Sequence, residues 1–492
     1  MKYWLVYLLF LPVWAPGQQY SIKVNGGYGS GLFNAGDTIH IWAREEKLTE
    51  TFQNWSGDTS WMINPEEWHA IGIMPPRNVT VTAEFQDLPS GAKLTFERMQ
   101  GRDTLKPVQY YFPPKGPTAK ALVWIFHGTG GSFHSITDQI EGTSIVKKLV
   151  ANGYAVAISE SEESTYRRDF DGDGNLRWRY VASADNVDMQ NIQQFRDTFV
   201  ARGYIDPLLP NMGLGFSAGG AFALINGWFM KFARGVSYCA PGSVGIADKS
   251  DMPSQWFMGF NDNHPDVGKA GNDTARIISA ALDQRGVCSQ FNLFPPSPCY
   301  PEYFRRISGI DPVLSAQIFN ELMTMGAFTS RNFPKLYPDQ IKGIVLTSPS
   351  KYPALSSLTA AQIIHLDDQL IVLIAGHHVQ SHFNGRMLRF LDEACGEITT
   401  PYSDLRSPLG FELWPNPASH RLFIRLVGVQ DQKISVQLTG LDGKLIRYYT
   451  RDHHQKESIE LNLPESLRSG VYGLRLTGSL GYRNSEKLTI LQ

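Results

Sequence analysis

Short runs of consecutive apolar residues recur through the middle of the chain, separated by polar and glycine-rich segments. Such runs are typical of strands that are buried on both faces of a parallel sheet. They cover residues 121–126, 154–158, 236–239 and 256–260, with a poorer strand at 211–214. Apolar residues at helical spacing predict helices over 185–202 and 218–234. This alternation predicts an α/β domain with a mostly parallel sheet and helices on both faces.

Apolar and polar residues alternate strictly near both ends of the chain, as expected for strands with one exposed face. The alternating segments are 20–24, 38–43 and 79–85 on one side, and 422–424, 434–438, 470–476 and 486–490 on the other. They predict a small all-β domain over 18–87 and a β-sandwich over 408–492, preceded by a polar linker at 403–407. The α/β domain then spans 88–402.

One stretch of the α/β domain, from about 268 to 366, is too long for a plain connection between strands. It includes a predicted helix over 304–325 and a proline-rich segment beside Cys299. We expect this stretch to form a lid or cap subdomain.

The first 17 residues predict an export signal. Lys2 precedes an apolar run over 4–14, and the small residues Ala15 and Gly17 stand before a possible cleavage site at Gln18. No other segment reaches the roughly 20 apolar residues that a membrane-spanning helix needs. We therefore expect an exported protein without a membrane span.

Composition excludes some partners. The chain of 492 residues is 42% hydrophobic and 19% charged, with a formal net charge of -2. These values are ordinary for globular protein and give no reason to expect a nucleic acid or an anionic membrane as partner.

The pentapeptide Gly215-Phe216-Ser217-Ala218-Gly219 lies between the strand 211–214 and the helix that follows it. This G-x-S-x-G pattern is that of a nucleophile elbow, in which a serine on a sharp turn between strand and helix exposes its hydroxyl. Glycines at the flanking positions let the two elements approach closely. Alone, the pattern also fits a glycine-rich turn with an incidental serine, but the flanking strand and helix favour the elbow. Ser217 is the predicted nucleophile.

A glycine-rich segment, His127-Gly128-Thr129-Gly130-Gly131, follows the strand 121–126. An acyl-transfer enzyme of this kind places an oxyanion-hole donor at such a turn. We expect the backbone N–H groups of Thr129 and Ala218 to form the oxyanion hole. His127 fits better as a residue that holds this loop by hydrogen bonds than as one that transfers protons.

The carboxylate that orients the base is predicted just past the strand 256–260. In α/β-hydrolases the triad occurs in the chain order serine, acid, histidine. Asp262 is the predicted acid and Asp266 the alternative. Either residue could instead serve only in a turn.

Three histidines follow the apolar run 369–374, which we expect to be the last strand of the sheet. Histidine suits the role of base because its ordinary pKa near 6.5 lets it accept and return a proton near neutrality. His377 directly follows Gly376, the usual Gly-His form, which favours it. His378 remains an alternative, and His382 is expected to cap the final helix.

Residues 169–175 resemble the opening of a calcium loop, with Asp169, Asp171 and Asp173 at alternate positions and Gly174 at the sixth. Tyr180 stands at the twelfth position, where such loops carry a glutamate. A tight polar turn and a structural calcium site both fit this segment. No other cofactor is expected.

Four cysteines in an exported chain could form two disulfides. Cys288 and Cys299 close a short proline-rich loop and are the predicted pair. Cys239 and Cys395 fit buried free thiols equally well.

The segment 127–131, the elbow 215–220 and the Gly-Tyr-Ile-Asp-Pro sequence at 203–207 together resemble secreted α/β-hydrolases of the polyhydroxybutyrate depolymerase, feruloyl esterase and acetylxylan esterase type. The resemblance covers about 150 residues around the elbow. It implies an α/β-hydrolase fold and the hydrolysis of esters, including those of polymeric substrates. The stretch 268–366 departs from it, which leaves the substrate specificity open.

Both flanking domains carry resemblances of their own. The N-terminal segment, with Trp55-Ser56-Gly57-Asp58 and Met74-Pro75, resembles a small β repeat of bacterial surface and secreted proteins, where it would be a spacer or a binding module. The C-terminal segment, with Trp414-Pro415-Asn416-Pro417 and Asp442-Gly443-Lys444, resembles the sorting domain of the type IX secretion system; a generic carbohydrate-binding sandwich is the alternative. The resemblance to the sorting domain implies the secretion machinery as partner and a secreted or cell-surface location.

These observations predict a secreted serine esterase in which Ser217, Asp262 and His377 or His378 form the triad. A catalytically inactive surface binding protein on the same scaffold is the alternative from another class. A lipase or a peptidase of the same fold is a further alternative.

Overall fold

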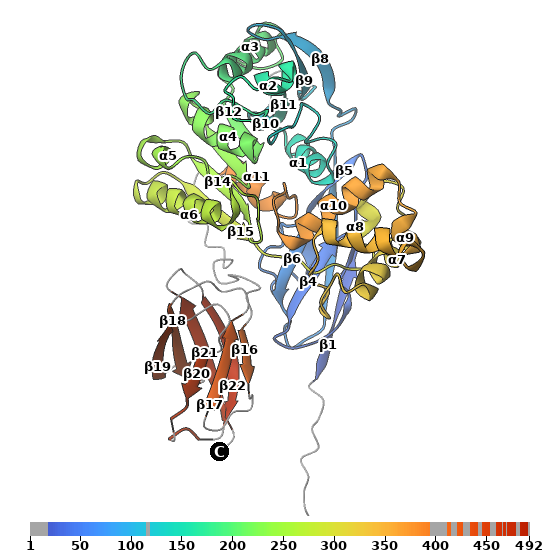
Figure 1. Ribbon diagram of the computed structural model, residues 1–492, viewed down its shortest axis with the longest axis vertical. Coiled ribbons are helices and arrows are strands. Elements are labelled where there is room, and N and C mark those ends of the chain that lie inside the picture. Colours follow the sequence, from blue (N-terminus) through green and yellow to red (C-terminus); the bar gives the residue numbers. More distant parts are fainter. Residues whose placement is uncertain are drawn as a thin grey trace, which may run out of the picture. The chain divides into compact units, whose positions relative to one another are not determined.

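The computed structural model of the chain describes residues 18–114 and 119–393, together with 411–414, 421–426, 433–440, 445–452, 459–464, 466–468, 470–478 and 483–490 (Figure 1). The predicted signal peptide and the linker 403–407 lie outside these residues. The chain divides into two compact units near residue 395. We describe each unit by itself.

An eight-stranded sheet lies at the centre of the first unit, in the order β15-β14-β13-β12-β10-β11-β9-β8. Neighbours from β11 through β10, β12 and β13 to β14 run parallel, whereas β9 and β8 are antiparallel. The bounds are β8 Thr95–Gln100, β9 Leu105–Tyr111, β10 Leu122–Phe126, β11 Ala155–Ile158, β12 Asn211–Phe216, β13 Arg234–Tyr238, β14 Ser254–Gly259 and β15 Ser289–Phe294.

Helices connect these strands, as the alternating pattern predicted. They are α1 Ile140–Ala151, α2 Glu162–Tyr166, α3 Val187–Ala201, α4 Ala218–Phe229, α5 Val244–Lys249 and α6 Gly268–Gln284; a further helix, α11 Asn384–Asp392, comes after the last strand of the sheet. Every residue of β10 and β11 is buried. Strands covered on both faces need no polar positions, which explains their uninterrupted apolar runs.

The prediction of a last strand at 369–374 is wrong. These residues form the second half of helix α10, Ala360–Ile374. Thr359 and Gln362 start this helix with a capping box, and Ala375 ends it in the left-handed conformation. A short apolar run cannot distinguish a buried helix from a buried strand. The last strand of this sheet along the chain is instead β15, at the edge of the sheet.

The long insertion also begins later than residue 268. Residues 268–294 form α6, which packs on β14 and α5, and the strand β15. We define the insertion as residues 297–373, which lie between β15 and the predicted base. It contains the 3-10 helices η1 Tyr303–Arg306 and η2 Pro349–Lys351, and the helices α7 Pro312–Thr324, α8 Pro338–Thr347, α9 Pro353–Ser356 and α10. The predicted single helix over 304–325 is thus η1 followed by α7.

Residues 18–87 form two small sheets, ordered β3-β1-β7-β5 and β2-β4-β6. We call them the N-terminal β part. Its strands are β1 Gln19–Asn25, β2 Gly27–Tyr28, β3 Gly31–Asn34, β4 Thr38–Ala43, β5 Glu50–Gly57, β6 His69–Ile73 and β7 Val79–Asp87. Figure 1 shows β4 and β6 beside the helices of the insertion, and the two share one hydrophobic core, including Trp42, Trp68, Tyr303, Leu370 and Leu373.

The second unit consists of two sheets, β16-β17-β20 and β19-β18-β21-β22. The strands are β16 Phe411–Trp414, β17 Arg421–Leu426, β18 Lys433–Thr439, β19 Leu445–Asp452, β20 Ile459–Asn462, β21 Gly470–Gly478 and β22 Arg483–Ile490. Leu422 and Leu461 of the first sheet and Val436 and Leu476 of the second belong to one core. This is the sandwich that the alternating pattern predicted.

The predicted disulfide between Cys288 and Cys299 is wrong, whereas the alternative of a buried free thiol is confirmed for Cys239. Cys288 is disulfide-bonded, but Cys299 and Cys239 are buried free thiols. Strand β15 lies between Cys288 and Cys299 in the chain. Its six residues are extended over about 20 Å, which keeps the two cysteines apart. Cys395 lies outside the described residues.

No helix within the described residues is both long and apolar enough to cross a membrane.

Candidate active site

Ser217 stands at the turn between β12 and α4, where the elbow pattern predicted it. Its φ of 52° lies in the left-handed region, which is strained for a residue with a Cβ. A Cβ on Gly215 would lie 2.1 Å from the carbonyl oxygen of Gly219, and one on Gly219 would lie 2.3 Å from that of Phe126. Only glycine fits at either position, so the close approach of strand and helix explains both glycines.

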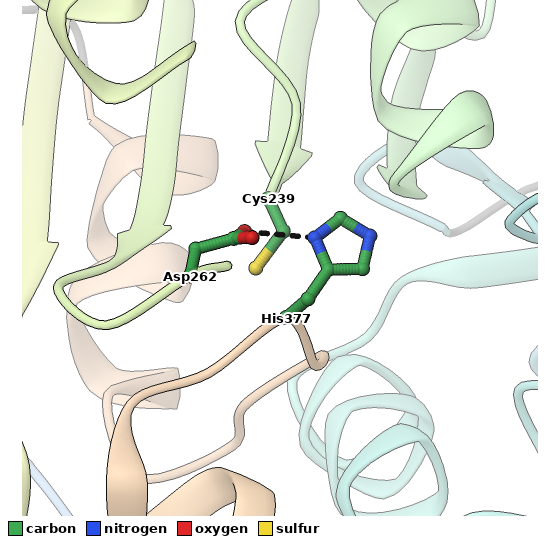
Figure 2. Close-up of side chains that lie close together, drawn as sticks. All are labelled: Cys239, Asp262 and His377. Atoms are coloured by element: carbon green, nitrogen blue, oxygen red, sulfur yellow. Dashed lines mark hydrogen bonds and ion pairs between the residues drawn. The ribbon is translucent and has the colours of Figure 1, made fainter. Parts of the chain in front are cut away.

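His377 lies between Ser217 and Asp262. Its Nε2 is 2.9 Å from the Ser217 hydroxyl oxygen, and its Nδ1 is 2.7 Å from the Asp262 carboxylate. Figure 2 shows the second of these contacts. In the tautomer that fits both, Nδ1–H donates to Asp262 and Nε2 accepts the serine proton. The geometry is that of a nucleophile, a base and an orienting carboxylate.

Asp262 lies just beyond β14 with its side chain buried. Its second oxygen accepts the backbone N–H of His264 at 2.9 Å. The imidazole of His264 stacks on that of His377, with ring centroids 4.4 Å apart. Asp266, the alternative acid, is exposed, and its backbone N–H donates to His264.

His378 makes different contacts from His377. Its Nδ1–H donates to the carbonyl of Val379 at 2.7 Å, and its Nε2 lies 3.2 Å from the Asp368 carboxylate. Burial lowers the pKa of His378, but the hydrogen bond to Asp368, the charge of that carboxylate and the bond to Val379 together raise the pKa above the ordinary value. Of the adjacent histidines, only His377 contacts Ser217.

His382 does not cap α11, as was expected. The N-cap position belongs to Phe383, and it makes no side-chain capping bond. His382 instead stacks on Trp68, with centroids 5.1 Å apart, and its Nε2 lies 3.3 Å from the Tyr303 hydroxyl. Burial lowers the pKa of His382 to about 3, so this imidazole is neutral at pH 7.

The glycine-rich loop after β10 lies against the elbow. A Cβ on Gly128 would come within 3.3 Å of the Ser217 Cβ. Within the described parts of the chain, the backbone N–H groups of Thr129 and Ala218 have no acceptor. Both are therefore free to donate to a ligand, as an oxyanion hole requires.

His127 is buried beneath this loop. Its Nδ1–H donates to the Gly128 carbonyl at 2.6 Å, and its Nε2 accepts the backbone N–H of Ser161 at 3.1 Å. Burial lowers the pKa of His127 to about 4. Both ring nitrogens are occupied, so the imidazole holds the loop.

Two residues beside Ser217, Asp262 and His377 were missed by sequence reasoning. His264 follows Asp262 by two positions, and Cys239 follows β13, which neighbours the elbow strand in the sheet. The thiol of Cys239 is 3.3 Å from the His378 carbonyl oxygen, and Figure 2 shows it next to Asp262. The position at a strand end was the available signal for Cys239.

Two groups of side chains in the described residues have the spacing of metal ligands. One is Cys239, Asp262 and His377, in which the carboxylate and imidazole already bind each other. The other is Glu163, Asp169 and Asp171. Oxygens of the Asp169 carboxylate accept the N–H groups of Gly172 and Gly174, both at 2.7 Å.

Asp173, the third predicted calcium ligand, is outside that group. It pairs with Arg177 and accepts the N–H of Asn175 at 2.8 Å. These bonds satisfy the loop as a polar turn, and the remaining lone pairs of Glu163, Asp169 and Asp171 would be the ones to bind calcium.

Comparison of sequences bears on the second unit. Residues 412–491 match the secretion system C-terminal sorting domain. The predicted sorting domain is confirmed. It indicates a secreted or cell-surface protein. No curated protein matches the chain in sequence.

Solved structures resemble the first unit. The dienelactone hydrolase from Anabaena variabilis has 14% sequence identity, with a TM-score of 0.30, over 42% of this chain and 88% of that chain. An α/β serine hydrolase without lid from Xanthomonas campestris has 14% identity over 42% and 86%, with a TM-score of 0.29. An α/β serine hydrolase homologue from Coxiella burnetii has 17% identity over 46% and 96%, also with a TM-score of 0.29. The first unit has the α/β-hydrolase fold, as its sheet order and elbow indicate.

Proposed function

We propose that the protein is a secreted serine hydrolase that cleaves carboxylic esters. The observation that carries this proposal is the contact of one imidazole with both Ser217 and Asp262, at 2.9 and 2.7 Å. Such a chain of hydrogen bonds activates a serine hydroxyl, which is a weak nucleophile by itself.

In the proposed reaction, His377 Nε2 takes the proton of Ser217 while the serine oxygen attacks the ester carbonyl carbon. Asp262 stabilises the imidazolium that forms. The backbone N–H groups of Thr129 and Ala218 stabilise the oxyanion. The imidazolium then protonates the leaving alcohol, and a water molecule activated by the same imidazole hydrolyses the acyl-enzyme.

The substrate we propose is an ester carried by an extracellular polymer, either an acyl ester of a plant-wall polysaccharide or a polyester. The support is the resemblance of segments 127–131 and 203–220 to depolymerases and to feruloyl and acetylxylan esterases. Export through the type IX secretion machinery, directed by residues 412–491, fits a substrate too large to enter a cell.

A panel of substrates tests this function. Chromogenic esters of short and long acyl chains, a feruloyl ester, acetylated xylan and polyhydroxybutyrate would be offered to the wild-type protein and to Ser217→Ala. We expect hydrolysis by the wild type only, together with covalent labelling of Ser217 by a fluorophosphonate. Equal rates for both proteins would refute the nucleophile. Absence of both hydrolysis and labelling would favour the inactive binding protein.

A further inference from the structure

The predicted base is separated from the sheet by the insertion. Strand β15 ends at Phe294, and the chain reaches His377 only after residues 297–373. The backbone N–H of Ser297 donates to the carbonyl of Leu373 at 2.8 Å, so the insertion leaves and returns at one place. His377 thus lies in a loop between α10 and α11, residues 375–383, which we call the histidine loop. No strand within the described residues leads directly into it. Contacts with other segments therefore fix its position, and at its start the backbone N–H of Asn261 donates to the carbonyl of Ala375 at 2.9 Å.

A buried carboxylate holds the far end of the histidine loop. Glu141, in the first turn of α1, is fully buried. Its carboxylate accepts the backbone N–H of Ser381 at 2.8 Å and the Ser381 hydroxyl at 2.6 Å. It also accepts the side-chain amide of Gln369, near the end of α10, at 2.9 Å. Ser381 is four residues beyond His377, so Glu141 fixes the loop on the side away from α10.

The counter-charge comes from the insertion. Arg306, in η1, lies 2.7 Å from the Glu141 carboxylate, and its side chain is 8% exposed. It also donates to the hydroxyl of Ser381 at 3.3 Å and to the side chain of Gln369 at 2.7 Å. Its guanidinium lies 4.5 Å above the ring of Trp68, in the N-terminal β part. Four segments of the chain therefore meet at this pair.

Burying the Glu141–Arg306 ion pair costs free energy, and hydrogen bonds to neighbouring groups offset this cost. Removing two charges from water is repaid only when their remaining hydrogen-bonding positions are filled. Burial raises the pKa of Glu141, but Arg306 and the hydrogen bonds from Ser381 and Gln369 together hold the pKa below its ordinary value. A buried ion pair is weak evidence for stability, whereas polar groups of this kind can specify one arrangement among several.

We propose that Glu141 and Arg306 are positioning residues for His377. Through Ser381 they set the place of the histidine loop, and through Arg306 the insertion becomes part of the catalytic scaffold. This inference rests on the proposed function, because it concerns the base of that reaction. The competing explanation is that the pair only fastens the insertion to α1.

The test is made in the full-length protein with three variants. Glu141→Gln combined with Arg306→Met removes both charges and avoids leaving one unpaired. Ser381→Ala removes only the hydroxyl from this cluster. Glu321→Gln is the matched control, because Glu321 accepts the N–H groups of Ala354 and Leu355 inside the insertion and does not contact the histidine loop.

For each variant, kcat and KM on a short-chain chromogenic ester, the rate of fluorophosphonate labelling of Ser217 and the melting temperature are measured. A base displaced by about 1 Å costs on the order of 100-fold in rate. We expect the double variant to lose about 10- to 100-fold in kcat and in labelling rate, with KM within about 2-fold. Ser381→Ala should lose less in kcat, with a smaller fall in melting temperature than the double variant, and Glu321→Gln should keep wild-type kcat.

Two results would overturn the inference. One is a double variant that melts earlier but keeps wild-type kcat and labelling rate, since this is the behaviour of a purely structural pair. If the double variant does not fold, Ser381→Ala decides: wild-type kcat and labelling in this variant reject the proposal, and a loss of both supports it. Failure of the proposed function is distinguished beforehand, because the wild-type protein itself would then neither hydrolyse esters nor label at Ser217.

Discussion

Alanine substitution at the two adjacent histidines should separate catalysis from stability. His377→Ala removes the group that contacts both Ser217 and Asp262. His378→Ala removes a ring whose nitrogens contact the Val379 carbonyl and Asp368. The two changes delete the same side chain from neighbouring positions, so each is the control for the other.

The magnitudes follow from these contacts. Loss of a triad base costs about 10⁴- to 10⁶-fold in kcat, which is about 5 to 8 kcal/mol of activation free energy. Loss of the two His378 contacts costs about 2 to 4 kcal/mol of unfolding free energy, because one of them is to a charged group. We therefore expect His377→Ala to be folded and inactive, and His378→Ala to be active within about 10-fold but less stable.

Steady-state hydrolysis of a chromogenic ester and urea unfolding measure the two quantities. A further variant, His378→Gln, retains a hydrogen-bonding side chain and should recover part of the lost stability. The reasoning is refuted if His377→Ala keeps more than about 1% of wild-type kcat. It is also refuted if a folded His378→Ala is as inactive as His377→Ala.

Three further predictions can be checked directly. Ser217→Ala should fold normally and lose at least about 10⁴-fold in kcat. A smaller loss of kcat in an ester hydrolysis assay would disprove its role as nucleophile. Calcium at Glu163, Asp169 and Asp171 would stabilise the folded state by mass action, so chelation should lower the melting temperature; an identical melt would favour the polar turn. His382 has a folded pKa of about 3, below its ordinary 6.5, so its contribution is complete above pH 6.5 and is lost as pH falls toward 3. Between pH 7 and pH 5, the wild type should lose about 2 kcal/mol relative to His382→Gln in urea unfolding, and a constant difference would contradict the buried neutral state.

The local sequence was sufficient to predict the elements that depend on contacts between residues close together in the chain. The glycines at 215 and 219 are required by backbone contacts within one turn, so the elbow was predicted to the residue. The strands β10, β11, β13 and β14 were predicted to within about two residues, because strands buried on both faces are largely apolar; the buried polar residues Ser254 and Gln255 explain why the start of β14 was missed. The chain order of serine, acid and histidine then restricted the remaining site residues to two short segments.

Tertiary structure decided what depends on contacts between distant segments. The run 369–374 has the same apolar content as a buried strand, and its packing with the N-terminal β part, together with the capping box at Thr359 and Gln362, identifies it as helix α10. The choice between His377 and His378 depends on the direction in which each side chain leaves the loop after Ala375, and that loop is held by Glu141 and Arg306, 165 positions apart in the sequence. No pattern within the loop encodes these contacts, because their energy arises only when α1, the insertion and the histidine loop are brought together.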